Sequence, residues 1–187
     1  RFCILEGRFA VEATWRDFQG RTGTARAGSL TDDTGYFWFF DEANVEIVVK
    51  AIDGSAYNSQ FWIYFGALSN VEYTIRVTDT GPGLRPDQIG RVFEPFDRLG
   101  AEQTTVEGTG IGLTLSQGLA RIMSGRLEVS SVLGEGSVFS LVLPASTVPS
   151  VDAVRLVGVS IGSAARLTRV LYIEDNPTNT HLMQRIA

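Results

Sequence analysis

Two glycine-rich segments that begin 29 residues apart constrain this chain more than any other feature. The first glycine box is Asp79-Thr80-Gly81-Pro82-Gly83-Leu84, and the second glycine box is Gly108-Thr109-Gly110-Ile111-Gly112-Leu113. A phosphate chain needs backbone N–H groups that it can approach closely, and glycine permits both that approach and positive φ angles. The pattern therefore predicts a phosphate-bearing ligand, although the first box taken alone equally suits a plain turn.

The residues after the second box predict a helix and then a hairpin. Apolar residues recur at helical spacing, at Ile111, Leu115, Leu119 and Ile122, and Gly125 is expected to end the helix. The amides and dipole at the start of this helix favour an anion. Two strands are expected next, at 126–129 and 137–143, joined by the turn 134–136 and closed by Pro144.

The first 78 residues are rich in aromatic and β-branched side chains and predict antiparallel β structure. The expected strands are 8–15, 36–40, 45–49, 61–65 and 71–77, separated by turn signals at Gln19-Gly20, Asp33-Thr34-Gly35, Asp53-Gly54 and Ser69-Asn70. Asp79 follows the last of these strands. A carboxylate at the end of a strand can accept a hydrogen bond from an exocyclic amine such as that of adenine.

Composition narrows the class of protein. A net charge of -5 argues against a large surface for nucleic acid, and no run approaches the ~20 apolar residues that a membrane span needs. The single cysteine, Cys3, can form no internal disulfide. Because the chain begins at Arg1, without methionine or a signal-like segment, we expect a fragment or a processed piece.

The two boxes and the segment between them resemble histidine kinases. The order Asp79 to Leu84, then Val92-Phe93-Glu94-Pro95-Phe96, then Gly108 to Leu113, followed by a helix and Gly125-Arg126-Leu127, is similar to the G1, F and G2 boxes of that family. The resemblance covers about a third of the chain. It implies an α/β sandwich of the Bergerat type, ATP and Mg²⁺ as cofactors, and phosphoryl transfer to a protein histidine.

The resemblance also assigns roles to residues. It implies that Asp79 binds the adenine amine and that Gly81 and Gly83 form the pocket wall. The phosphates would then lie at Gly108, Thr109, Gly110, Gly112 and Leu113. Phe93 and Phe96 would form the base of a lid, and the alternative for them is a pair of core aromatics flanking a proline turn.

Two parts of a working kinase are not found beside these boxes. The best register for the helix that carries the metal-binding asparagine is 44–53, but Lys50 stands at the asparagine position and the run is β-branched. Asn44 and Asn58 suit turn or surface positions better. If 41–53 form a strand, the pocket lacks its metal wall. The only histidine, His181, lies after the last predicted strand, so no phosphoacceptor histidine is expected here.

The flanks resemble other families. Trp15-Arg16-Asp17-Phe18, Tyr36 to Asp41 and Val71 to Thr80 resemble a β-rich module of secreted bacterial proteins, which suggests a junction of two unrelated sequences at Val77-Thr78-Asp79-Thr80. Residues 169–179 resemble the start of a response-regulator receiver domain, with Glu174 and Asp175 as its acidic Mg²⁺-binding pair. Taken alone, the Glu-Asp-Asn-Pro run is also a helix-capping turn.

These observations favour an α+β chain with a β-rich part at 1–78, an ATP-binding region at 79–147, a linker at 148–168 and a truncated receiver at 169–187. The expected function is the ATP-binding part of a hybrid sensor histidine kinase. Its partners would be a histidine-containing dimerisation domain and the receiver, in a cytoplasmic and homodimeric setting. The alternatives are a β-sandwich interaction module or chimeric fragment with a nonfunctional nucleotide site, and a non-kinase ATPase of the same superfamily.

Overall fold

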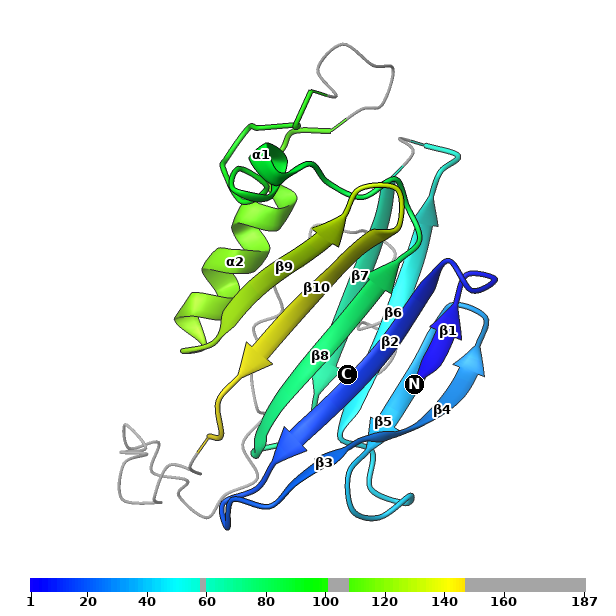
Figure 1. Cartoon of the computed structure of the whole chain (residues 1–187). Helices are drawn as coiled ribbons and strands as arrows, with labels where there is room; N and C mark the ends of the chain where they lie inside the picture. The colour runs from blue at the N-terminus through cyan, green and yellow to red at the C-terminus, as the bar shows by residue number, and fades with distance from the viewer. Residues whose placement is uncertain (58–59, 101–107, 147–187) are drawn as a thin grey trace, which may run out of the picture. The chain divides into compact units, whose positions relative to one another are not determined.

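The computed structural model describes residues 1–57, 60–100 and 108–146, which contain ten strands and two helices (Figure 1). The strands are β1 (Phe2–Ile4), β2 (Phe9–Arg16), β3 (Thr22–Thr24), β4 (Arg26–Thr31), β5 (Thr34–Trp38), β6 (Ile47–Gly54), β7 (Gln60–Ala67), β8 (Glu72–Asp79), β9 (Arg126–Val132) and β10 (Gly136–Leu143). The helices are α1 (Pro86–Ile89) and α2 (Gly112–Ile122). The mixed α+β character is therefore confirmed, with strands in the majority.

The larger sheet is antiparallel and has β8 at its centre. Its strand order is β1-β2-β8-β10-β9, and β3 also pairs with β2. One edge of β8 pairs with β2 from Phe9↔Asp79 to Arg16↔Glu72, and the other edge pairs with β10 from Val138↔Thr78 to Leu143↔Tyr73. The β8 strand thus includes residues 78 and 79, and its two ladders connect the N-terminal strand β2 with the hairpin that follows the second box.

The smaller sheet, β4-β5-β6-β7, packs on the larger one and closes the core. Strand side chains alternate between the two faces, so β6 sends Ile47, Val49 and Ala51 inward while Lys50 and Ile52 point outward. The buried cluster comprises Phe2, Ile4, Val11, Ala13, Tyr73, Ile75 and Leu143 from the larger sheet and Phe37, Ile47, Val49 and Ala51 from the smaller.

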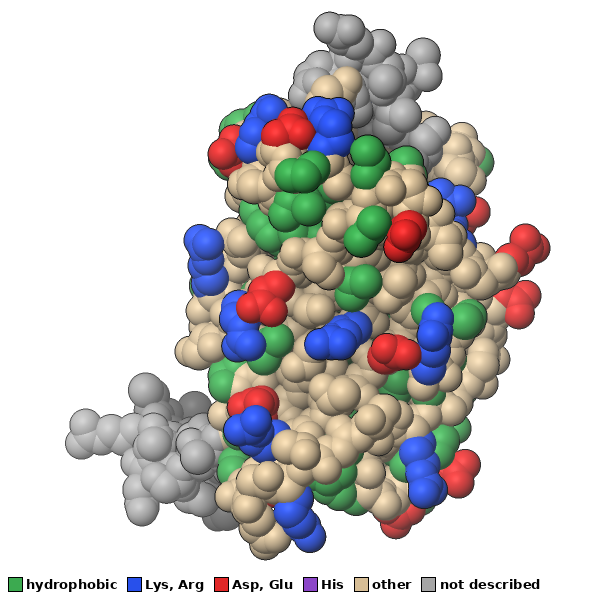
Figure 2. Space-filling view, in the orientation of Figure 1, with side chains coloured by type: hydrophobic (Ala, Val, Ile, Leu, Met, Phe, Trp, Pro, Cys, Tyr) green, Lys and Arg blue, Asp and Glu red, His purple; other side chains and the backbone are tan. Residues whose placement is uncertain are grey.

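The outward face of the larger sheet is polar. Figure 2 shows arginine and acidic side chains interspersed over it. Cross-strand or neighbouring pairs account for part of this pattern, with Arg16 Nε 3.7 Å from Glu72 Oε1 and Arg126 Nε 2.8 Å from Glu128 Oε1. The alternation of apolar inner and polar outer residues explains why the sheet is covered on one face only.

The α2 helix packs against β9 and β10 with the face that carries buried Ala120. The helical spacing predicted this element correctly. The apolar stripe that revealed it nevertheless faces away from the sheet, since Ile111, Leu115, Leu119 and Ile122 are 42%, 61%, 51% and 82% exposed. The helix ends at Ile122, and Ser124 rather than Gly125 takes the positive φ angle.

The strand predictions for the N-terminal region are confirmed by β2, β5, β6, β7 and β8, and β9 and β10 confirm the hairpin. The short strands β1, β3 and β4 were not predicted. The linker at 148–168 and the receiver start at 169–187 lie outside the described residues. In the part of the chain that the structure describes, neither helix is long and apolar enough to cross a membrane.

Residues 44–53, the register considered for a metal-binding helix, form no helix. After a turn, β6 begins at Ile47 and continues to Gly54. The Lys50 ammonium lies 2.6 Å from Asp33 Oδ2 and 3.3 Å from the Thr34 hydroxyl. Hydrogen bonds from Lys50, Thr31 and Thr34 hold the pKa of Asp33 well below its ordinary value of 3.8.

Two isoleucines of β6 test the two-sheet core. Ile47→Ala should lower the free energy of unfolding by about 2–5 kcal/mol, because Ile47 is fully buried, whereas exposed Ile52→Ala should cost below about 1 kcal/mol. Urea unfolding followed by tryptophan fluorescence measures both. Equal losses for the two variants would contradict the assignment of Ile47 to the interior.

The Lys50–Asp33 pair makes stability depend on pH. Because the folded pKa of Asp33 is lowered, the unfolded chain binds the proton more readily, so this contribution is complete above about pH 4–5 and declines as the pH falls further. We expect wild type to exceed Asp33→Asn in urea resistance at pH 7, with the gap narrowing from pH 4 to pH 2. A gap that stayed constant over this range would contradict the linkage.

Candidate nucleotide site

Asp79 stands at the end of β8 on the inward face of the larger sheet. Its parity along the strand matches that of Ile75 and Val77, and its neighbour in the ladder is Phe9. The Oδ1 atom of Asp79 accepts a hydrogen bond of 2.7 Å from the Gly81 N–H. The Oδ2 atom has no hydrogen-bond partner among the described residues. This oxygen is therefore available to accept a bond from a ligand amine.

The first glycine box is held by the β9–β10 turn. The Ser131 hydroxyl accepts a hydrogen bond of 2.7 Å from the Leu84 N–H and donates one of 2.7 Å to the Gly136 carbonyl. The Gly134 N–H donates to the Pro82 carbonyl at 2.7 Å. Gly83 has a φ of +71°, and a side chain there would collide with the Val132 carbonyl. The box is thus a turn that hydrogen bonds hold against the β9–β10 hairpin, and its backbone packs closely on that hairpin at Gly83.

The second glycine box is tied to the segment that carries Phe93 and Phe96. The Phe96 N–H donates to the Gly110 carbonyl at 3.0 Å, and the Thr114 hydroxyl donates to the Phe93 carbonyl at 3.0 Å. Gly110 has a φ of +69°, and a Cβ there would lie 2.8 Å from the Phe96 carbonyl carbon. Only glycine fits this position without strain.

The remaining residues of the second box leave their backbone near solvent. Gly108, Thr109 and Gly112 are exposed, and Leu113 is half-buried in the first turn of α2. An exposed helix start with small residues suits an anion. Phe93 is half-buried, whereas Phe96 is 74% exposed with a φ of +65°, so Phe96 is not a core aromatic.

Side chains from residues 1–78 also lie near the two boxes. The Phe61 ring of β7 packs edge-on against Phe9 with centroids 5.4 Å apart, and the Arg8 guanidinium lies 4.1 Å above the Phe61 ring. The Gln60 side chain lies against Gly108, close enough that a Cβ on Gly108 would collide with the amide. Figure 1 shows that β8 and β9 end, and β2 and β7 begin, at the same end of the fold.

A metal wall like that of the kinase family is not seen in the described part of the chain. Most of residues 44–53, where the family's metal-binding helix would stand, form β6, and Lys50 there is bound to Asp33. The Asn44 amide donates a hydrogen bond of 2.6 Å to Glu46 Oε1. No group of three or more histidine, cysteine or acidic residues capable of holding a metal occurs among the described residues. Asn58, Glu174, Asp175 and His181 lie outside them.

Sequence reasoning missed the positioning residues Ser131 and Thr114. The Ser131 hydroxyl holds the first box at Leu84, and the Thr114 hydroxyl ties the segment of Phe93 to α2. The only signal in the sequence was their position, since Thr114 directly follows the second glycine box and Ser131 shortly precedes the glycine turn 134–136. A separate open pocket of about 390 Å³, whose lining includes Thr14, Arg16, Thr24, Glu72 and Thr74, lies at the opposite end of β8 from Asp79. It is not part of the candidate site.

Known proteins are similar to this chain over a range that includes both glycine boxes. The profile of the histidine kinase-, DNA gyrase B- and HSP90-like ATPase family matches residues 40–147. The sensor protein TorS of Escherichia coli is 37% identical over 193 aligned residues, covering 98% of this chain and 20% of TorS. The autoinducer 2 sensor kinase/phosphatase LuxQ of Vibrio cholerae is 37% identical over 119 residues, covering 60% of this chain and 14% of LuxQ.

A solved structure of the mycobacterial sensor histidine kinase MprB is 27% identical, with a TM-score of 0.36 over 41% of this chain and 53% of that one. The chain spans only part of the relatives' length, 20% of TorS and 14% of LuxQ. The family match covers more than half of the chain and includes both glycine boxes. The chain belongs to the family of histidine kinase-, DNA gyrase B- and HSP90-like ATPases.

Proposed function

We propose that this chain binds ATP as the nucleotide-binding part of a sensor histidine kinase of two-component signalling. The observation that carries the proposal is the placement of both glycine boxes at one end of the fold, each held by specific backbone hydrogen bonds (Figure 1). The family match over residues 40–147 and the sensor proteins among the relatives support it.

The free Asp79 Oδ2 would accept the adenine amine, with Gly81 and Gly83 at the wall of the base pocket. The phosphates would approach the backbone of Gly108, Thr109, Gly110, Gly112 and Leu113. Phe93, hydrogen-bonded to α2, and Phe96, hydrogen-bonded to the second box, would form the base of the lid. In this arrangement the protein contributes positioning and charge stabilisation, which is what phosphoryl transfer requires.

Magnesium does not fit the register that the family resemblance assigns to it. That register lies on a strand, and Lys50 places a positive charge there, held by Asp33. A cation at this position repels a second cation, so we derive no catalytic step through Mg²⁺ in this chain.

The parent protein is proposed from the relatives and from the sequence. We infer a hybrid kinase in which residues 169–187 begin a receiver domain with Glu174 and Asp175 as its acidic pair. The phosphoacceptor would be a histidine-containing dimerisation domain of a cytoplasmic homodimer, whose signal-sensing region would be associated with the membrane. The phosphoryl group would pass from ATP to that histidine and then to a receiver aspartate.

One observation favours a second candidate. The strand at 47–54 and the charge of Lys50 suit a β-sandwich module joined to the boxes near residues 77–80. In that case residues 1–78 resemble the secreted module and the boxes do not function. The two candidates differ in one measurable property, the binding of nucleotide by this chain.

Titration of the full chain with a fluorescent ATP analogue tests this property. We expect saturable binding that Asp79→Asn weakens about tenfold or more, since a charge-assisted hydrogen bond is lost. Gly110→Ala should weaken it as well, because of the positive φ angle and the close Phe96 backbone. Binding should change little when Mg²⁺ is omitted.

Matched controls are Asp32→Asn, an exposed carboxylate away from the boxes, and Gly66→Ala, where a Cβ meets nothing within 4 Å. Both should bind like wild type. Wild-type binding that survives Asp79→Asn and Gly110→Ala would overturn the site assignment. A complete lack of binding by the wild type would favour the interaction module.

A further inference from the structure

A nucleotide in this site would need a positive group for its phosphates. A triphosphate carries several negative charges, and in the kinase family's register the described chain offers Lys50, which is already bound to Asp33. The glycine boxes supply N–H groups but no cationic side chain. A positive side chain for the phosphates must therefore come from a residue that the fold brings close to the boxes.

Arg8 is brought there by the β2–β8 ladder. Phe9 is the register partner of Asp79, so Arg8, which ends the turn immediately before β2, lies beside the start of the first glycine box. Its side chain extends over β7, where the guanidinium lies 4.1 Å above the Phe61 ring. The preceding residue, Gln60, which begins β7, lies against Gly108 of the second box. Arg8 thus lies beside the first box, and the ring that it covers is adjacent in β7 to the residue that contacts the second box.

The charge of Arg8 is not consumed by an ion pair. Seven other cationic side chains of the described residues form ion pairs, whereas no carboxylate of these residues lies within 4.0 Å of the Arg8 guanidinium. Asp53 is near enough for Arg8 to contribute, after hydrogen bonds from Ser55, to the lowered pKa of that carboxyl. Arg8 is exposed, so a ligand can reach it.

Stacking on Phe61 also prepares the guanidinium for an anion. A guanidinium that lies on an aromatic ring keeps its N–H donors at the edge, directed away from the ring, in the planar fork that fits phosphate oxygens. Phe61 is itself fixed by the edge-on contact with Phe9. The arginine therefore loses less rotational freedom on binding than a free surface arginine would.

Resting on the proposed nucleotide-binding function, we propose that Arg8 binds the phosphate groups of the nucleotide and that Phe61 positions it. The nucleotide site is then composite, since the glycine boxes provide backbone N–H groups and the turn between β1 and β2 provides the positive charge. Residues 1–78 thereby complete the site instead of merely preceding it.

The test compares adenosine, ADP and ATP on the full chain. Arg8→Gln should weaken ATP binding about tenfold or more, weaken ADP binding less, and leave adenosine binding unchanged, because the lost interaction is with phosphate. Arg8→Lys should restore part of the loss. Phe61→Leu should give an intermediate loss for ATP, since the arginine remains but its platform is removed.

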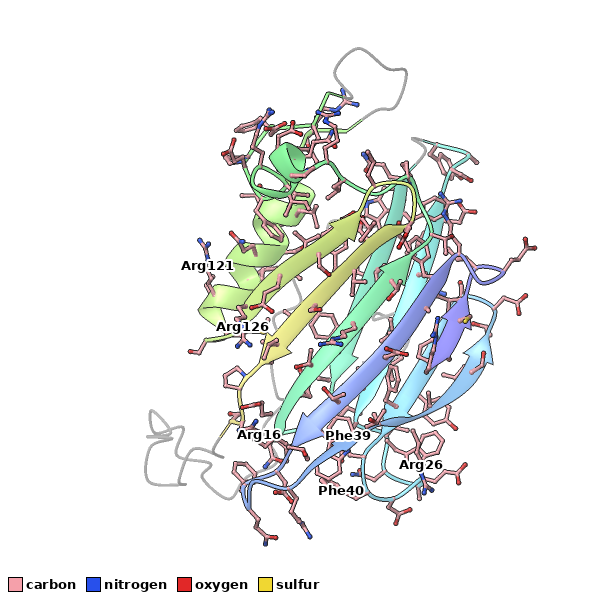
Figure 3. All side chains as sticks on the ribbon, viewed as in Figure 1. Arg16, Arg26, Phe39, Phe40, Arg121 and Arg126 are labelled. Carbon is pink, nitrogen blue, oxygen red and sulfur yellow. The ribbon has the colours of Figure 1, made fainter. Side chains whose placement is uncertain are left out.

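Arg16→Gln is the matched control, because Arg16 ends β2 whereas Arg8 immediately precedes its start (Figure 3). It should bind all three ligands like wild type. If Arg8→Gln weakens the three ligands equally, or none of them, the inference is overturned while the proposed function stands. If wild type binds none of the three, both fail. Unchanged thermal unfolding of ligand-free Arg8→Gln shows that its losses do not arise from misfolding.

Discussion

The pairing of β8 on both of its edges is the constraint on which the rest of this structure depends. Through β2 it connects to the N-terminal strands, and through β10 it connects to the hairpin and helix that follow the second glycine box. Tyr73 and Ile75 of the same strand lie in the core shared with the smaller sheet. A single strand therefore fixes the position of Asp79 relative to both halves of the described chain, and neither half could shift without breaking a ladder.

The two boxes owe their geometry to partners distant in sequence. Ser131 holds the first box from 47 residues away, and Thr114 holds the segment of Phe93 from 21 residues away. Glycine allows these close approaches but does not cause them. The positive φ angles of Gly83 and Gly110 occur where the Val132 carbonyl and the Phe96 backbone already fill the space that a side chain would need. The boxes are thus shaped by tertiary packing.

The sequence was sufficient for elements whose signal is local. Alternating β-branched residues predicted β2 and β6, and the strand character of β6 correctly argued against a metal-binding helix. Strands of three residues, such as β1 and β3, are too short to carry a pattern, and β4 contains glycine and serine. The register Phe9↔Asp79 joins residues 70 positions apart, so no local pattern could place Arg8 beside the first box.

The composite site separates binding of a nucleotide from transfer of its phosphoryl group. One guanidinium at about 4 Å from a phosphate, with an effective dielectric constant near 20, contributes on the order of 4 kcal/mol of attraction before desolvation. That is enough to orient a phosphate chain already held by backbone N–H groups. Transfer needs more, because charge develops on the departing γ-phosphoryl and must be neutralised as it moves. Lys50, fixed to Asp33 on β6, is not placed to supply this neutralisation, so the role that we propose for Arg8 is limited to binding.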